Sequence, residues 1–169
     1  MQIRRLTPED ASAFLSFRFA ALLDMPSAFG SSYEEERVLP LGTIEGRLAV
    51  KEDRGIFGAL EGGKLIGMVA LGRESMRKLA HKGMIWGMYV APESRGQGVG
   101  KALLLEALAL ARSIDQLQQV NLSVNAANLP AIRLYESVGF KEFGHEPGAL
   151  LIEGELHDEV HMYLRLHGA

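Results

Sequence analysis

A glycine-rich stretch near the middle of the chain has the residue types that bind phosphate: Arg95-Gly96-Gln97-Gly98-Val99-Gly100-Lys101. Glycines allow the backbone to turn tightly and to approach a ligand closely. The free amides at the start of the helix that follows point outward where the helix dipole is positive, so they attract phosphate oxygens. The two flanking cations add to this attraction. A glycine-rich turn without a ligand is the alternative, and turn chemistry alone does not account for the flanking charges.

The spacing of these glycines excludes the two commonest nucleotide-binding loops. A Walker A loop has a glycine five residues before its Gly-Lys pair and a hydroxyl residue after it, whereas these positions are Arg95 and Ala102. A dinucleotide-binding loop has the pattern Gly-x-Gly-x-x-Gly directly after a strand. Here the pattern is Gly-x-Gly-x-Gly, and residues 91–95 intervene. We therefore expect the loop to bind the phosphate of another carrier.

Three predicted elements must hold the loop in place. Residues 84–90 form an apolar run that ends before Pro92, residues 98–114 carry apolar side chains on one helical face, and residues 120–124 alternate as a strand does. Two strands joined through a helix are normally parallel neighbours with a right-handed crossover. The loop is thus expected between the end of the first strand and the start of the helix.

The rest of the chain predicts a mixed α/β or α+β domain of about seven strands and four helices. Gly62-Gly63 indicates a hairpin turn between two apolar strands. Thr7 and Asn128 are expected to cap helices. The other strands are expected at residues 2–6, 56–60, 64–71, 141–158 and 159–166, and the other helices at residues 11–23, 32–50 and 128–139.

Composition narrows the class of protein. The chain has 169 residues, a formal net charge of −3 and no cysteine. The absence of cysteine excludes disulfides, thiolate metal sites and a cysteine nucleophile, and no HExxH pair suggests a zinc site. The net charge argues against a protein that coats nucleic acid or an anionic membrane. With neither an apolar signal core nor a long apolar run, we expect one cytoplasmic domain over residues 1–169.

Two sequence motifs resemble those of the GNAT N-acetyltransferases, and they follow one another in the same order as in that family. The run Val90-Ala91-Pro92-Glu93-Ser94-Arg95-Gly96-Gln97-Gly98-Val99-Gly100 is similar to the acyl-CoA motif of that family, Arg/Gln-x-x-Gly-x-Gly/Ala. The second is Asn125-Ala126-Ala127-Asn128 followed by Leu134-Tyr135-Glu136-Ser137-Val138-Gly139-Phe140. The resemblance covers residues 56–140 well.

The resemblance implies a mixed, mostly antiparallel seven-stranded sheet whose fourth and fifth strands splay apart into a V-shaped cleft. Residues 84–90 would be the fourth strand and residues 120–125 the fifth. The co-substrate it implies is acetyl-CoA, with no metal. Its pantetheine arm would pair with the backbone near Met88, Tyr89 and Val90 and contact Asn128. Its pyrophosphate would lie on the amides of Arg95, Gly96, Gln97, Gly98, Val99, Gly100 and Lys101.

The chemistry expected is direct attack of an amine on the thioester, because a chain without cysteine cannot form a cysteinyl acyl-enzyme. Tyr135 matches the tyrosine of the family that protonates the departing sulfur; a tyrosine packed on an amphipathic helix is the alternative. Family members often carry a general base at the positions of Met84 and Trp86, and neither side chain can accept a proton. The base then lies elsewhere, or water takes the proton, or the amine has a low pKa.

The acceptor is less defined than the donor. The resemblance places Phe29, Tyr33 and Glu34 beside it, with Glu34-Glu35-Glu36 attracting a cationic amine. A solvated acidic helix start is the alternative for the glutamates, and an apolar anchor of the helix is the alternative for Phe29 and Tyr33. Asp158 is a second candidate, with a surface turn as its alternative. We expect an acetyltransferase acting on a primary amine of a small metabolite or amino acid. A protein or peptide acceptor, or a silent acyl-CoA-binding sensor, are the alternatives. Family members are often dimers, and the sequence leaves the oligomeric state open.

Overall fold

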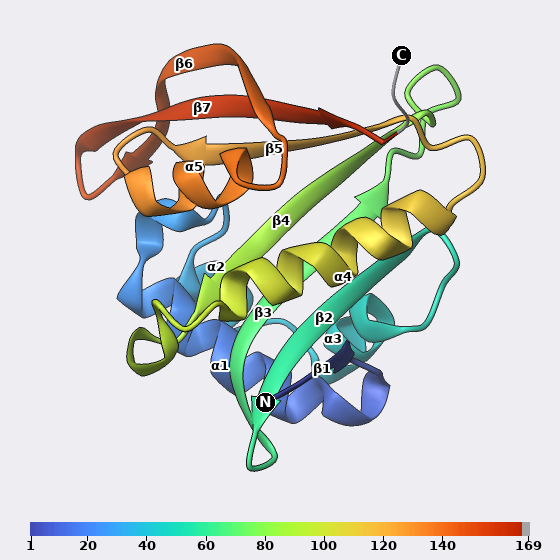
Figure 1. Ribbon diagram of the computed structural model, residues 1–169. Coiled ribbons are helices and arrows are strands. Elements are labelled where there is room, and N and C mark those ends of the chain that lie inside the picture. The colour runs from blue at the N-terminus through green and yellow to red at the C-terminus, as the bar shows by residue number, and fades with distance from the viewer. Residues whose placement is uncertain (167–169) are drawn as a thin grey trace.

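Within residues 1–166, seven strands form one mixed sheet in the order β1-β2-β3-β4-β5-β7-β6 (Figure 1). The computed structural model describes residues 1–166, so the last three residues of the expected domain lie outside the described part. The sheet is antiparallel except between β4 and β5, as expected for this fold class. The strands are β1 (Gln2–Arg5), β2 (Arg54–Glu61), β3 (Lys64–Arg73), β4 (Lys82–Val90), β5 (Gln119–Asn125), β6 (Lys141–Ile152) and β7 (Glu155–Arg165).

Helices cover both faces of this sheet. In Figure 1, α4 crosses one face over β2, β3 and β4, and α1 and α3 lie on the other. No helix among residues 1–166 is long and apolar enough to cross a membrane. The α-helices are α1 (Ala11–Asp24), α2 (Tyr33–Glu36), α3 (Leu41–Leu48), α4 (Val99–Ser113) and α5 (Leu129–Glu136), with short 3-10 turns η1 (Pro8–Asp10), η2 (Pro26–Ala28) and η3 (Pro92–Ser94).

The parallel pair β4 and β5 separates soon after it begins. Only residues 82–84 of β4 pair with residues 119–121 of β5. Beyond that point β5 pairs only with β7, up to Asn125, while β4 stays paired with β3. The expected splay of the fourth and fifth strands is therefore confirmed. It leaves the β5-facing edge of residues 85–90 without a strand partner.

The single helix predicted over residues 32–50 is wrong. Ser32 caps the start of a helix, because its hydroxyl accepts the Glu35 N–H at 3.2 Å. The Glu35 carboxylate in turn accepts the Ser32 N–H. That helix, α2, ends at Glu36, and Pro40 stands before α3. Proline has no N–H to continue a helix and disfavours helical backbone in the preceding residue. The split gives five α-helices where about four were expected.

The boundary predicted between the last two strands, at Asp158 and Glu159, is also wrong. The turn lies earlier, at Glu153 and Gly154, whose φ angles are 51° and 85°. Two consecutive residues with positive φ form the tight turn whose twist matches that of the adjoining strands. Asp158 consequently lies within β7 rather than in a surface turn.

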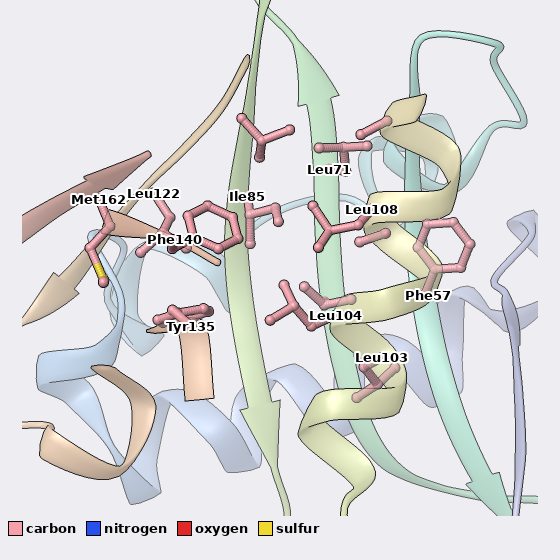
Figure 2. Packing of buried hydrophobic residues seen from close by; sticks show 14 of the residues in the cluster. Phe57, Leu71, Ile85, Leu103, Leu104, Leu108, Leu122, Tyr135, Phe140 and Met162 are labelled. Atoms are coloured by element: carbon pink, nitrogen blue, oxygen red, sulfur yellow. The ribbon is translucent and has the colours of Figure 1, made fainter. Parts of the chain in front are cut away.

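The larger part of the core lies between α4 and the sheet. Leu103, Leu104 and Leu108 are completely buried, and Figure 2 shows them facing Phe57 and Leu71 of β2 and β3. This stripe repeats at helical spacing, as the amphipathic pattern of residues 98–114 predicts. The start of α4, and with it the glycine loop, is therefore fixed against the sheet.

A second, smaller core fixes α1 and α3 on the opposite face. It contains Leu6, Phe14 and Leu22 from the N-terminal segment, Ile44 and Leu48 from α3, and residues of the sheet such as Met68 and Tyr89. Both faces of the central strands are thus covered, which accounts for the nearly continuous apolar sequence of β3.

Replacing Leu104 by Ala should test this account of the main core. The change leaves a cavity against the sheet, so we expect the free energy of unfolding to fall by about 3 kcal/mol. Leu105→Ala is the matched control, since Leu105 is 47% exposed on the other side of α4, and it should change stability by less than about 1 kcal/mol. Urea denaturation measures both. Equal losses would contradict this packing.

Candidate functional site

The glycine-rich loop lies at the start of α4, as the sequence predicts. Gly98 immediately precedes the helix with a φ of 81°. A Cβ atom at Gly96 or Gly98 would have no heavy atom within 4 Å, so both residues border open space. The first amides of α4 have no acceptor within the helix. They are available to an anion in that space, which is the geometry that phosphate binding requires.

A cavity of about 490 Å³ lies between this loop, the end of β4 and α5. We call it the loop cavity. Every residue expected to contact the co-substrate lines it except Gln97, whose side chain instead donates to the Glu93 carbonyl at 3.0 Å. The residues brought together are Met88, Tyr89, Val90, Arg95, Gly96, Gly98, Val99, Gly100, Lys101 and Asn128.

Further lining residues were not predicted. Ala131 and Leu134 line the cavity from α5, and their spacing of three residues on a helix is a signal that the sequence did carry. Met25 and Ala28 line it from the segment after α1. Only the tertiary fold brings that segment to β4. Asn128 has a structural task as well, because its Oδ1 accepts the Ala131 N–H at 3.2 Å and caps α5.

Arg95 connects the loop to the end of α1. Its Nη2 donates to Asp24 Oδ2 at 2.7 Å, and its Nε donates to the Val90 carbonyl at 2.9 Å. The Tyr89 hydroxyl donates to the same Asp24 oxygen at 3.0 Å. Hydrogen bonds from Arg95 and Tyr89 lower the pKa of Asp24, whereas burial and the bond to Asp24 raise the pKa of Tyr89 to about 12. Arg95 is thus a structural clamp, while Lys101 remains exposed.

Tyr135 lies beside the loop cavity but not among its lining residues. Its side chain is buried and packs edge-on against Phe140, with ring centroids 5.9 Å apart. Burial raises the pKa of its phenol above the usual range, so the group is neutral. Among the described residues no fully buried side-chain oxygen or nitrogen lacks a partner, and the Tyr135 hydroxyl has none within the fold. Its oxygen therefore keeps some contact with open space.

A second cavity, of about 560 Å³, lies on the other face of the sheet. Its charged lining residues are Arg18, Glu36, Arg47, Lys51 and Arg54, and its apolar floor comes from β2, β3 and β4. We call it the cationic cavity. It reaches β4 at Trp86 and Gly87. Trp86 is 47% exposed there, and no proton acceptor stands at its position or at that of Met84.

A buried ion pair organises the cationic cavity. Arg18 Nη2 lies 2.8 Å from Glu36 Oε1, and Ser31 donates to the same oxygen at 2.6 Å. Burial by itself would raise the pKa of the Glu36 carboxyl, but the hydrogen bonds from Arg18 and Ser31 and the charge of Arg47 lower it further than burial raises it. Glu36 is consequently an anion with little basicity. Its role is to hold Arg18, rather than to accept a proton.

The residues expected beside the acceptor gather elsewhere. Phe29, Tyr33 and Glu34 line a third cavity, between α2 and the turn of the β6–β7 hairpin, which we call the hairpin cavity. Asp158 is not free for catalysis, because its carboxylate binds His145 Nε2 at 2.9 Å and accepts the Gly148 N–H at 2.8 Å. These bonds hold the hairpin together.

Comparison with known proteins finds similarity to acetyltransferases. The profile of the acetyltransferase (GNAT) family matches residues 19–140. Spermidine N(1)-acetyltransferase of Vibrio cholerae is 33% identical over 84 residues, which are 50% of this chain and 49% of that protein. Mycothiol acetyltransferase of Acidothermus cellulolyticus is 45% identical over 62 residues, 37% of this chain and 19% of that one. The chain thus spans half or less of these curated relatives.

Solved structures show the same fold over the full length. An acetyltransferase of the GNAT family from Streptococcus pneumoniae superposes with a TM-score of 0.86 at 24% identity, covering 97% of this chain and 98% of that one. A putative acetyltransferase from Salmonella typhimurium, solved with acetyl-CoA, gives 0.81 at 21% identity, covering 100% and 95%.

Replacing Glu36 by Gln should test the buried ion pair. The change leaves the Arg18 guanidinium buried without its neutralising carboxylate, so we expect the free energy of unfolding at pH 7 to fall by about 3 kcal/mol. The pKa of Glu36 is below its ordinary value of 4.5 in the fold. The stabilisation is therefore complete above that pH and is lost as the pH falls through the folded-state pKa.

Urea denaturation from pH 7 downward measures this difference between Glu36→Gln and the wild type. The difference in the free energy of unfolding should shrink once the pH drops below the ordinary pKa range of a glutamate. Glu34→Gln, at an exposed position on the same short helix, is the control and should stay within about 0.5 kcal/mol of the wild type. A loss for Glu36→Gln that does not depend on pH would contradict the ionised pair.

Proposed function

Because the chain belongs to the acetyltransferase (GNAT) family, we propose that it transfers the acetyl group of acetyl-CoA directly to a primary amine of a small metabolite or amino acid. The observation that carries the proposal is the loop cavity, in which the glycine loop, the start of α4 and the free edge of β4 border one space. The cavities have volumes of about 490 and 560 Å³, within the range of about 300–1,000 Å³ that small ligands occupy.

Acetyl-CoA fits the groups that this space presents. Its pyrophosphate needs amide donors and positive charge, which the first turn of α4 and Lys101 supply. Its extended pantetheine arm carries amides, and the unpaired edge of residues 85–90 offers backbone groups to them as a strand would. Leu134 and Val99 add apolar surface. The Val90 carbonyl is held by Arg95, so the arm would use other groups of β4.

The transfer then needs no covalent intermediate on the protein. The chain has no cysteine, so the neutral amine attacks the thioester carbonyl and the thiolate of coenzyme A departs. We assign to Tyr135 a hydrogen bond donated to that sulfur. Its pKa lies well above that of a thiol near 8.5, so full proton transfer from it is uphill. Its contribution is to stabilise the developing thiolate, which then takes a proton from solvent or from the acetylated nitrogen.

The attacking amine must lose a proton, and β4 supplies no base. Met84 and Trp86 cannot accept one, and Glu36 is held as an anion by Arg18, Ser31 and Arg47. Deprotonation is therefore assigned to water in the open cavities. This favours acceptors whose amine has a modest pKa, and it predicts a rate that rises with pH until the amine is neutral.

Replacing Gly98 by Glu should abolish binding of acetyl-CoA while the fold persists. The carboxylate would stand in the space assigned to the pyrophosphate, and its repulsion should weaken binding on the order of a hundredfold or more. Gly63→Glu is a matched control, because Gly63 has the same φ of 81° and equally open surroundings, but lies in the β2–β3 turn. Each variant carries about 1–2 kcal/mol of backbone strain.

Isothermal titration calorimetry with acetyl-CoA measures both glycine variants. Gly63→Glu should bind acetyl-CoA as the wild type does. Unchanged affinity in Gly98→Glu would remove the loop from the binding site, and equal losses in both variants would assign the effect to stability.

Replacing Tyr135 by Phe should slow the chemical step without changing the stability of the protein or its affinity for acetyl-CoA. The hydroxyl has no hydrogen-bond partner among residues 1–166, so stability and acetyl-CoA affinity should stay unchanged, while kcat falls on the order of a hundredfold. Tyr163→Phe, on β7, is the control and should keep full activity. Release of free thiol from acetyl-CoA across a panel of amines gives the rates. Wild-type kcat in Tyr135→Phe would refute its role at the sulfur.

A further inference from the structure

The lining of the cationic cavity has an unusual charge balance for a site that would receive an amine. Arg18, Arg47, Lys51 and Arg54 face a single carboxylate, Glu36. Arg54 is itself paired with Asp53, which lies outside the lining, at 3.2 Å. Even so, cations exceed anions around this space. A polyamine entering it would meet like charge, whereas an anionic group would be attracted.

One donor in this cavity is already aimed and has no partner. The Arg18 side chain is 10% exposed, and its Nε and Nη2 are used by Glu36 and Ser31. Its Nη1 has no hydrogen bond within the described residues. Because no fully buried side-chain nitrogen there lacks a partner, this nitrogen borders the open cavity. A buried guanidinium fixed on two of its three nitrogens is well suited to bind a carboxylate or phosphoryl oxygen with the third.

Arg18 Nη1 lies close to β4, at a point where consecutive residues of this strand line the two cavities. It is 3.6 Å from where a Cβ atom of Gly87 would stand. Gly87 lines the cationic cavity, and the next residue, Met88, lines the loop cavity. The pairing of β3 with β4 is irregular here, and Gly87 has a φ of 65°. An oxygen held by Arg18 would therefore lie beside Gly87, whose neighbour in the chain, Met88, lines the cavity assigned to the acyl donor.

We infer that the acceptor is an amino-acid-like anion, a primary amine with a carboxylate or phosphoryl group within a few bonds, and that Arg18 and its neighbouring cations bind this group. The inference rests on the proposed acetyl transfer and specifies its acceptor. An anion on Arg18 leaves a nearby amine free to reach the thioester beside Met88. The apolar floor of the cavity, with Ile56, Met68 and Ala70, accommodates the rest of the molecule.

The hairpin cavity is the competing acceptor site, and its charge is opposite. Glu34, Glu35 and Glu153 line it, and none of its described lining residues belongs to β4. It would suit a cationic acceptor, but it does not reach Gly87 or Met88. Ser31 lines both this cavity and the cationic one. The charge of the acceptor therefore decides which cavity it prefers, and the two sites give opposite predictions.

The decisive comparison uses α-amino acids with apolar side chains, the same amino acids as their primary amides, an aminoalkylphosphonate, and spermidine. An amide has the less basic amine and is the better nucleophile at neutral pH if charge is ignored. We expect the free carboxylates or phosphonates to have a KM at least tenfold lower than the amides, and spermidine to be the poorest acceptor. Amides or spermidine that perform as well or better would overturn the inference.

Binding is also measured without any reaction. Calorimetric titration of the same amino acids and amides into the protein alone reports on the cationic cavity whether or not acetyl-CoA is a substrate. Failure to bind acetyl-CoA would refute the proposed function. The titration would still show whether the cationic cavity prefers the anionic form of the ligand. Binding of acetyl-CoA, together with no preference for the anionic form in the titration, would refute the inference alone.

Variants locate the effect. Arg47→Gln and Lys51→Gln should each raise the KM for the anionic acceptor several-fold to tenfold, with the KM for the amide and for acetyl-CoA unchanged. Arg37→Gln removes an equivalent charge from an exposed site outside the lining and should change nothing. Arg18→Lys should give the largest rise, and thermal melting checks its fold. An effect of Glu34→Gln in place of these would move the acceptor to the hairpin cavity.

Discussion

The separation of β4 from β5 is the constraint on which the rest of the site depends. Two parallel strands that begin paired would normally continue, because each buried backbone group needs a partner. Here pairing stops after residues 84 and 121. β5 is retained by β7 on its other side, and β4 by β3. The free edge persists because both strands are anchored elsewhere, and it gives the fold a place for an extended ligand.

Helix α1 connects the two halves of this site. Its C-terminal part carries Arg18 to the cationic cavity and Asp24 to the clamp with Arg95 and Tyr89. Both side chains are charged, and each meets its partner from a distant part of the sequence. Phe14 and Leu22, from the same helix, lie in the smaller core. The helix therefore positions charge at two points along β4 while its apolar face keeps it fixed to the sheet.

Local signals in the sequence predicted much of the loop and little of the acceptor side. The glycines, the cap at Asn128 and the stripe on α4 are local patterns, so they could be recognised without knowledge of the tertiary fold. The splay came from resemblance alone. Pro40 is a local signal for a helix break, but the acidic run Glu34-Glu35-Glu36 before it favoured one continuous helix. The turn at Glu153-Gly154 needs a positive φ at a glutamate, which the sequence does not predict. By its helical spacing, Arg18 lies on the same face of α1 as apolar residues, so the sequence alone does not mark it as a binding residue. Its partner, Glu36, is eighteen residues away, so their contact depends on the tertiary fold.

The Arg95 clamp has a consequence for how the two substrates interact. The guanidinium joins the glycine loop to the last turn of α1, and the same helix presents Arg18 to Gly87 of β4. Because a rigid helix transmits a displacement at one end to the other, an adjustment of the loop around the proposed nucleotide would be shared with Arg18, the proposed anchor of the acceptor, or resisted by it. Heterotropic coupling between donor and acceptor, and a preferred order of their addition, would then arise from one helix rather than from a moving domain.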